Sequence, residues 1–329
     1  MDWSRRHRNA EGSELFLNYE SALLSPEISW DTLTASIVIP SRLYKYQSFI
    51  KADGNANPYW IRNMEGQFHM SLGCEFEDTE DCKPYFDRQL VVNYIDEFLQ
   101  SFNTDFKIRS KMREQLDSAL TNDYFASVTS RYQGDIRIGC FTDSSDNEDM
   151  WIKYAMGKSG YCIEYDTSKA ELFQLSTLPV LYQNQPYNCS FTLASTLILD
   201  ASRIGKKRTF EENFEIYKPI YEKIHKTAYI PVFIKQKERW NFEREYRMFL
   251  LKQRNTRNGM IEASQHLDSN YNLNLGSAVS SIYIGENFSS LNHHRELLET
   301  VIAICKTKRI KLFQKVAKDN GLKNSEIIL

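Results

Sequence analysis

The sequence predicts an α+β fold in which mixed central sheets are flanked by helices. Strand-like runs are scattered along the chain, long amphipathic stretches separate them, and no regular strand–helix–strand alternation connects them. A doubly wound parallel sheet would need that alternation. The chain has 329 residues, of which 42% are hydrophobic and 26% charged, so it can bury a large core. We expect an N-terminal helical leader over residues 1–41 and a single α+β domain of the catalytic type over residues 42–329.

The elements follow in order along the chain. The leader contains "EGSELFLNYESALLS", which has helical character. Helix is predicted from about Arg88 to Leu120, because apolar residues recur at i, i+3, i+4 and i+7 in "LVVNYIDEFLQSF". We treat residues 88–130 and 195–230 as helical insertions. Strands are predicted in "RLYKYQSF" (42–49), "DIRIGCFT" (135–142), "YCIEYD" (161–166), "LPVLYQ" (178–183), "AVSSIYIGE" and "RIKLFQKV".

The bulk properties favour a soluble chain with no membrane partner. A formal net charge of −2 gives no general attraction to nucleic acid or to anionic lipid. The N-terminus lacks an apolar signal core, and no window approaches 18 apolar residues. The six cysteines are scattered without a C-x-x-C pair, which is typical of reduced thiols. We therefore expect a cytoplasmic protein, although delivery into another cell by a dedicated machine would leave no mark in the sequence.

The stretch "RWNFEREYRMFLL" (239–251) carries an acidic pair beside an apolar run. Read as a strand, it places Glu243, Glu245 and Arg247 on one face, with the two carboxylates about 7 Å apart. Each carboxylate would raise the pKa of the other, and Arg247 would lower both. Such groups are costly to bury and are often functional. The alternative is a surface helix in which Glu243 pairs with Arg247 at i, i+4, but the terminal "MFLL" and the aromatics favour a strand.

Two other segments offer candidate binding residues. In "LYKYQSF", Tyr44 and Tyr46 share one strand face, and Lys45 lies on the other. A lysine between aromatics can hold a phosphate while the rings line an apolar slot. The alternative is an edge strand on which lysine discourages aggregation.

A strand that ends in Thr142 leads through a Ser/Asp turn into a helix. On that helix Trp151 and Tyr154 fall at i, i+3 on one face. They either contribute to a binding site or form an aromatic pair that fills the core.

The order of these motifs resembles a widespread bacterial family of domains of unknown function. Its members carry Leu-Tyr-Lys-Tyr, Cys-Phe-Ser, Met-Trp-x-x-Tyr-Ala, Gly-Phe-Cys-Ile-Glu-Phe and Trp-x-x-Glu-x-Glu-x-Arg, and the similarity spans roughly residues 42–250. The chain departs from the family at "FEDTED", where members have Phe-Asn-Asp-Pro-Phe. Phe76 and Asp78 can be matched there, but the Asn and the Pro are absent. The resemblance implies that the role of this loop is altered or lost in this chain.

The motif order of that family resembles in turn the layout of the ADP-ribosyltransferases. Carried over residue by residue, the resemblance implies an ADP-ribosyltransferase-like core with Glu245 as the catalytic acid. Glu243 would orient or deprotonate the acceptor, and Lys45 would take the basic role at NAD, although lysine is not equivalent to arginine there. The other residues implied at the cofactor are Tyr44, Tyr46, Thr142, Trp151, Tyr154 and Arg247.

These features predict an NAD-consuming enzyme, an ADP-ribosyltransferase or NAD glycohydrolase, that acts as a bacterial toxin or antiphage defence effector. NAD would be a co-substrate and no metal is expected, since the six histidines show no ligand spacing. The acceptor would be a protein or a nucleic acid, and an immunity or antitoxin partner is compatible with this function. Two alternatives stay open: a nucleotide-binding sensor or interaction module without turnover, and a magnesium nuclease built from Asp78, Glu164, Glu243 and Glu245.

Overall fold

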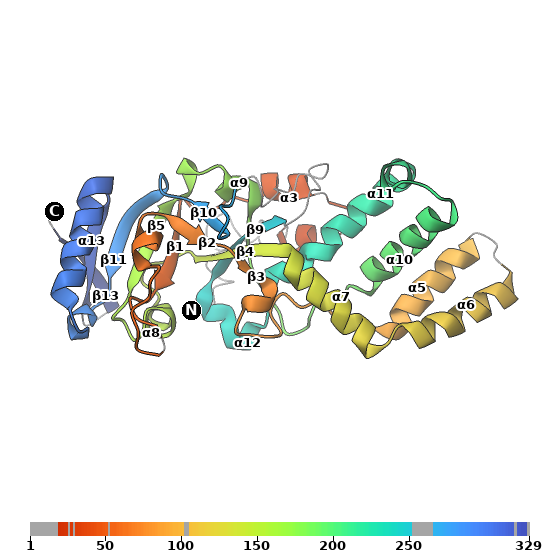
Figure 1. Ribbon diagram of the computed structural model, residues 1–329, viewed down its shortest axis with the longest axis horizontal. Helices are drawn as coiled ribbons and strands as arrows, with labels where there is room; N and C mark the ends of the chain where they lie inside the picture. Colours follow the sequence, from red (N-terminus) through yellow and green to blue (C-terminus); the bar gives the residue numbers. More distant parts are fainter. Residues whose placement is uncertain are drawn as a thin grey trace.

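The structure is a computed structural model that describes residues 19–25, 27–28, 30–51, 53–101, 105–251, 266–318 and 321–327. It has the predicted mixed character, an open sheet flanked by helices. Figure 1 shows an elongated molecule in which the sheet occupies one part and a lobe of long helices projects from it.

Nine of the described strands form the main sheet. Their order is β13 (Gly321–Ile327), β12 (Lys311–Lys318), β11 (Val279–Ile284), β5 (Tyr161–Asp166), β1 (Arg42–Gln47), β4 (Ile136–Thr142), β9 (Glu245–Leu251) and β6 (Thr177–Pro179), with β3 (Ser71–Leu72) also on β4. The pairings are antiparallel except that of β11 with β12. Two small sheets pair β2 (Gln67–His69) with β10 (Asn272–Asn274) and β7 (Leu181–Tyr182) with β8 (Ile234–Lys235).

The strands β1 and β4 are only weakly paired within the main sheet. These strands pair through one residue pair, Tyr44 with Thr142, whereas β1 and β5 pair over six residues. The strands therefore diverge beyond Tyr44. Phe68 packs closely on Gly139 of β4. A Cβ added at Gly139 would lie 2.6 Å from the Phe68 ring.

Five helices form the projecting lobe (Figure 1). They are α5 (Arg88–Ser101), α6 (Phe106–Ala119), α7 (Asn122–Asp135), α10 (Ser190–Gly205) and α11 (Phe210–Tyr229). They fall largely within the two segments predicted as helical insertions. Local sequence fixes where they begin: Asp105 and Thr121 cap α6 and α7, and Thr209 forms a capping box with Glu212 at the start of α11.

Other described helices lie outside this lobe (Figure 1). They are α3 (Trp30–Ser36), α4 (Trp60–Met64), α8 (Glu148–Tyr154), α9 (Leu172–Ser176), α12 (Lys237–Trp240) and α13 (His294–Lys308). None of the helices in the described ranges combines the length and the apolar content that crossing a bilayer requires.

The described part of the predicted leader packs against the rest of the chain. Residues 19–24 are helical, and Tyr19 and Leu23 are buried in a core cluster with residues of β4, β9 and the segment before β8. The Lys226 ammonium donates hydrogen bonds to the carbonyls of Ala22 and Ser25, which satisfies acceptors at the end of this helical segment. Residues 1–18 of the predicted leader lie outside the described residues.

The acidic motif is only partly a strand. β9 begins at Glu245, and Tyr246 and Met248 face one core cluster while Phe249 faces another, so the period-two separation of its faces is confirmed. The prediction that Glu243 lies on the same strand is wrong. Glu243 ends a 3₁₀ turn (Asn241–Glu243), and Arg244 has a left-handed backbone with φ of 49°.

Candidate functional site

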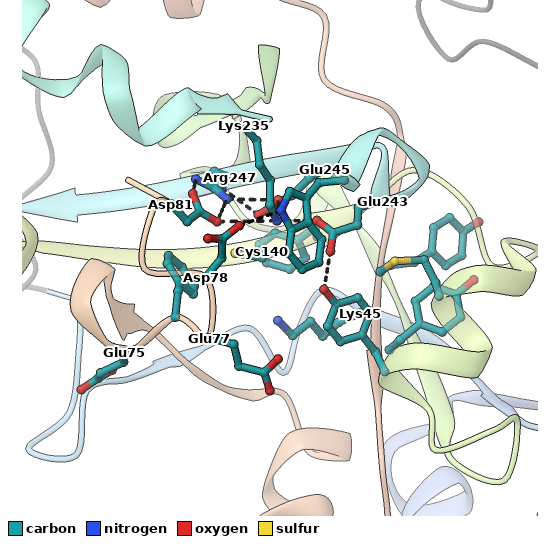
Figure 2. Close-up of a pocket in the computed structure, with 17 residues that line it drawn as sticks. Lys45, Glu75, Glu77, Asp78, Asp81, Cys140, Lys235, Glu243, Glu245 and Arg247 are labelled. Atoms are coloured by element: carbon teal, nitrogen blue, oxygen red, sulfur yellow. Dashed lines mark hydrogen bonds and ion pairs between the residues drawn. The ribbon is translucent and has the colours of Figure 1, made fainter. Parts of the chain in front are cut away.

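A cavity of about 250 Å³ opens where β1 and β4 diverge. Figure 2 shows Asp81, Lys235, Glu245 and Glu243 gathered along one wall, with Lys45 across from them. Seven of the nine residues predicted for the site line this cavity: Tyr44, Lys45, Tyr46, Tyr154, Glu243, Glu245 and Arg247. Residues from segments up to about 200 residues apart in the sequence therefore meet at this cavity.

The other two predicted residues, Thr142 and Trp151, are not among the residues that line the cavity. Thr142 is buried in the sheet, paired with Tyr44 on one side and Glu245 on the other. Trp151 is fully buried and packs edge-on against Tyr46, with ring centroids 5.1 Å apart. Its indole N–H donates to the carbonyl of Ser145 at 2.8 Å. Trp151 thus fills the core, as the alternative interpretation predicted. It packs against Tyr46, which lines the cavity.

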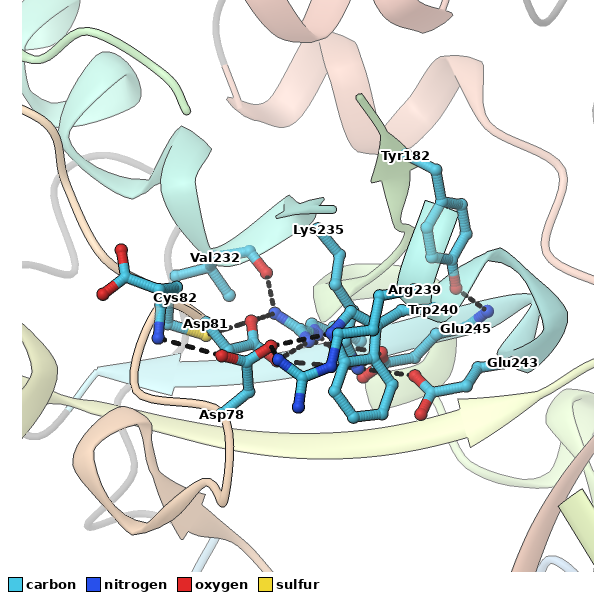
Figure 3. A network of polar contacts seen from close by, with 12 residues as sticks. Asp78, Asp81, Cys82, Tyr182, Val232, Lys235, Arg239, Trp240, Glu243 and Glu245 are labelled. Carbon is cyan, nitrogen blue, oxygen red and sulfur yellow. Dashed lines mark hydrogen bonds and ion pairs between the residues drawn. The ribbon is translucent and has the colours of Figure 1, made fainter. Parts of the chain in front are cut away.

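The centre of the wall is the Arg247 guanidinium, which is fully buried. Because residues two apart share a strand face, Glu245 lies beside it, and Arg247 Nε donates to Glu245 Oε1 at 2.7 Å. The two Nη atoms bind the two oxygens of Asp81 at 2.8 and 2.7 Å, and Nη1 also donates to the carbonyl of Val232 at 2.6 Å. Figure 3 shows this network, with Asp81 and Val232 toward one end and Glu245 and Glu243 toward the other.

Lys235, at the end of β8, is the second cation of the wall. Its Nζ lies 2.5 Å from Glu243 Oε2, 3.1 Å from Glu245 Oε2 and 3.6 Å from Asp81 Oδ2. Burial alone would lower the pKa of Lys235, but the three carboxylates outweigh it and raise the pKa above its usual value. Lys235 is therefore a fixed positive charge that bridges both members of the acidic pair.

The two glutamates experience opposite pKa shifts. Burial, the largest influence on both, raises their pKa values. For Glu245, the charges of Arg247 and Lys235 outweigh burial, so its pKa is well below the usual range. For Glu243, burial and the nearby Glu245 charge dominate over Lys235, so its pKa is raised. The expectation that Arg247 lowers both pKa values therefore holds for Glu245 only, because the turn at Arg244 takes Glu243 off the strand face.

Tyr154 holds the other oxygen of Glu243. Its hydroxyl donates to Glu243 Oε1, and burial together with this carboxylate raises the pKa of Tyr154. α8 is fixed against the turn that carries Glu243, since Asn147 caps the helix and its amide donates to the carbonyl of Phe242 at 2.5 Å. Glu243 is thus positioned by two elements far apart in sequence.

The "FEDTED" loop, residues 76–81, forms part of the cavity. Phe76, Glu77, Asp78 and Asp81 all line it. Asp78 accepts a hydrogen bond from the indole N–H of Trp240 at 2.7 Å, which seats that ring against the cavity. This loop, which departs from the family pattern, therefore contributes three carboxylates to the site in this chain.

Sequence reasoning missed Asp81, Lys235 and Trp240 as members of the site. Lys235 follows the apolar run "IPVFI", and a lysine at the end of such a run is a signal that could have been used. Asp81 gave no comparable signal, because its partner Arg247 is 166 residues away.

The cavity lining is rich in carboxylates and aromatic rings. Among the ionisable Asp, Glu, Lys and Arg side chains that line the cavity, six are acidic and three are basic. Aromatic rings supply much of the remaining wall, and cations are attracted to such rings. The volume, somewhat below the range of typical small-molecule sites, suits about one nucleoside rather than a dinucleotide.

The acidic wall does not have the arrangement of a metal site. Within the described residues, no group of three or more His, Cys, Asp or Glu side chains could hold a metal ion. The ammonium of Lys235 lies among the three carboxylates, where a cation would otherwise bind. Glu164, one of the four acids of the nuclease alternative, does not line the cavity and instead accepts hydrogen bonds from Ser280 and Tyr283 at 2.7 and 2.6 Å.

Comparison with known proteins gives one match. Residues 150–248 match the sequence model of a family described as a protein of unknown function (DUF2971). The matched region runs from α8 to β9 and includes Tyr154, Lys235, Glu243 and Arg247, whereas Lys45 and Asp81 precede it. This finding agrees with the predicted resemblance to a domain-of-unknown-function family. Searches of curated proteins and of solved structures found no match.

Proposed function

We propose that the protein consumes NAD, as an ADP-ribosyltransferase or an NAD glycohydrolase with an ADP-ribosyltransferase-like core. One observation carries the proposal: two adjacent carboxylates in one cavity wall have pKa values shifted in opposite directions. Pairs of this kind divide the work of a glycosidic cleavage, since one group stays ionised while the other exchanges a proton near neutral pH.

The donor would place its nicotinamide end in the cavity. The nicotinamide ring of NAD is a pyridinium cation, which suits an acidic pocket walled by Tyr44, Tyr154 and Trp240. The cavity holds about one nucleoside, so the phosphates would lie at or beyond its rim. Lys45 lines the cavity, and the exposed Lys153 and Arg239 lie over the Trp240 ring at 3.4 and 4.8 Å. These three cations would receive the pyrophosphate.

Cleavage breaks the bond between the ribose C1′ and the nicotinamide nitrogen, whose electron pair leaves with neutral nicotinamide. Positive charge then develops on the ribose. With Glu243 ionised, the wall of three carboxylates and two cations is net negative and stabilises that charge. Glu243, with its raised pKa, is the group suited to take the proton of the attacking water or acceptor.

These roles differ from the expectation that Glu245 is the catalytic acid. Both oxygens of Glu245 bind Arg247, and one also binds Lys235. Glu245 therefore acts as a positioning residue that keeps Lys235 beside Glu243, and Glu243 becomes the catalytic residue.

Nicotinamide release from NAD by the purified full chain tests the proposal. We expect wild type to release nicotinamide and Glu243→Gln to lose at least about 100-fold in rate with an unchanged melting temperature, because general base catalysis contributes that much. Glu299→Gln, an exposed position on α13, is the matched control and should retain full activity. A wild-type protein that is inert toward NAD with water, protein and nucleic-acid acceptors would overturn the proposal.

One observation favours a second candidate, a nucleotide-binding module without turnover. All four carboxylate oxygens of Glu243 and Glu245 already have partners in the wall. If this candidate holds, a nucleotide binds tightly and is recovered unchanged. Magnesium-dependent cleavage of nucleic acid would instead support the nuclease alternative.

As a toxin or antiphage defence effector, such an enzyme would act by removing NAD from a cell. Expression of wild type should then lower cellular NAD and arrest growth, whereas expression of Glu243→Gln should do neither. Growth arrest by both proteins would contradict this role for the site.

A further inference from the structure

We propose that an extended polypeptide binds in a groove that leads away from the first cavity. The first cavity shares Asp78, Asp81 and Lys235 with a second cavity of about 260 Å³. The second shares Lys83, Pro84 and Tyr85 with an open depression of about 440 Å³ along α7. The three spaces are therefore neighbours in a row, which we call the groove. A row of adjacent spaces suits a linear chain better than a compact ligand.

The lining of the groove matches the groups of a polypeptide. Four carboxamide side chains line the second cavity: Gln183, Asn184, Gln185 and Gln236. A carboxamide donates and accepts hydrogen bonds, as a peptide group does. Farther along, Phe86 and Phe125 stack with ring centroids 5.6 Å apart, and Tyr85, which is 47% exposed, lies between these two regions. Rings of this kind bind the apolar side chains of a peptide.

The charge of the groove distinguishes between the two polymers that could act as acceptor, a polypeptide and a nucleic acid. In the second cavity, Asp78, Glu80 and Asp81 face two lysines, one of which, Lys83, pairs with Glu80 at 2.7 Å. The first cavity has twice as many acidic as basic side chains. In the depression, Lys83 is the one Asp, Glu, Lys or Arg among the lining residues. Nucleic-acid binding needs cations along the phosphate backbone, so the groove favours a neutral or basic polypeptide over a nucleic acid.

The polypeptide would be the acceptor of the proposed transferase, and this part of the inference rests on the proposed function. A side chain that enters the second cavity reaches Asp78, Asp81 and Lys235, which also line the first cavity. Lys235 contacts Glu243 directly. The nucleophile of the acceptor would thus enter the first cavity beside these residues, where it bonds to the ribose C1′ as nicotinamide leaves and gives its proton to Glu243.

Binding is measured by fluorescence anisotropy with two labelled probes on the full chain. One probe is reduced, carboxamidomethylated ribonuclease A, a basic polypeptide that stays unfolded, and the other is a 20-nucleotide single-stranded DNA. We expect saturable binding of the polypeptide. Tyr85→Ala should weaken it at least tenfold, and Ala126→Trp should do the same by filling the depression along α7. Both positions are exposed, so neither variant should disturb folding.

Tyr59→Ala and Ala119→Trp are the matched controls at exposed positions outside the groove, and both should bind like wild type. Tighter binding of the DNA, no saturable polypeptide binding, or equal losses in the controls would overturn the inference. Failure of the proposed function is distinguishable from these outcomes. Tyr85→Ala should still release nicotinamide into water, and Glu243→Gln should still bind the polypeptide, so each assay can fail alone.

Discussion

Arg247 binds Asp81 through both of its Nη atoms, at 2.8 and 2.7 Å, although 166 residues separate the two in sequence. This bidentate pair fixes the loop of residues 76–81 to β9 and so closes one side of the cavity. Both side chains are buried, and their desolvation is offset only while every charged group keeps its partners.

Replacing Arg247 by Met should therefore lower the free energy of unfolding by about 3–5 kcal/mol, because Asp81 and Glu245 would remain buried without it. Urea denaturation measures this. Arg239→Met is the matched control, since its side chain is 63% exposed, and it should change stability by no more than about 0.5 kcal/mol. A loss below about 1 kcal/mol for Arg247→Met would contradict the account of the wall.

His225 should make stability depend on pH in the acid range. Burial lowers its pKa from 6.5 to about 4, so between these values the unfolded chain binds a proton that the folded chain does not. Stability therefore falls as pH decreases from 6.5 to 4. Between pH 7 and 4.5, wild type should lose about 2 kcal/mol more than His225→Phe in urea denaturation. Equal losses in the two proteins would show that His225 is not buried as a neutral ring.

Tyr154→Phe should move the pH profile of nicotinamide release. The Tyr154 hydroxyl lowers the pKa of Glu243 by hydrogen bonding, in opposition to burial. Without it, the pKa of Glu243 rises, and the ascending limb of the rate against pH should shift to higher pH. Tyr44 lines the same cavity, and Tyr44→Phe should leave the pH of the ascending limb unchanged. A shift of the limb to lower pH in Tyr154→Phe would contradict the role given to Glu243.

Thiol labelling should distinguish Cys74 from the other cysteines. All six are free, but Cys74 is the exposed one, and burial raises the pKa values of Cys82, Cys140 and Cys162. With Ellman's reagent at pH 8, one thiol of the native protein should react rapidly, and Cys74→Ser should abolish that phase. Six thiols should react in denaturant. Rapid reaction of Cys140 in the native state would show that the cavity wall opens.

The strands that the sequence predicted correctly are those whose side-chain pattern is local. The runs at 42–49, 135–142 and 161–166 are short and rich in aromatic and β-branched residues, and they correspond to β1, β4 and β5. The sequence did not predict β2, β3, β8, β10 or β13. Each of the first four has at most three residues, too few for a periodic signal. β13 is polar, "GLKNSEI", and is a strand because it pairs with β12 over seven residues.

The site was predictable where one short segment carries several of its groups. Glu245 and Arg247 follow the strand period, so their shared face could be derived. The conformation of Glu243 could not, because it depends on a left-handed backbone at Arg244, which non-glycine residues adopt rarely. Asp81 was missed because its partner Arg247 is brought close by tertiary structure alone, whereas Lys235 follows an apolar run that the prediction did not use.

The most direct test of the central claim is the pKa of each glutamate in the acidic pair. Carboxyl ¹³C signals of labelled protein can be followed by NMR against pH and assigned with Glu243→Gln and Glu245→Gln. We predict that Glu243 titrates above the ordinary value of 4.5, and that Glu245 stays ionised well below that value. If both carboxyls titrate near 4.5, or if the order is reversed, the cavity wall does not shift the two pKa values in opposite directions. The proposed chemistry would then be wrong.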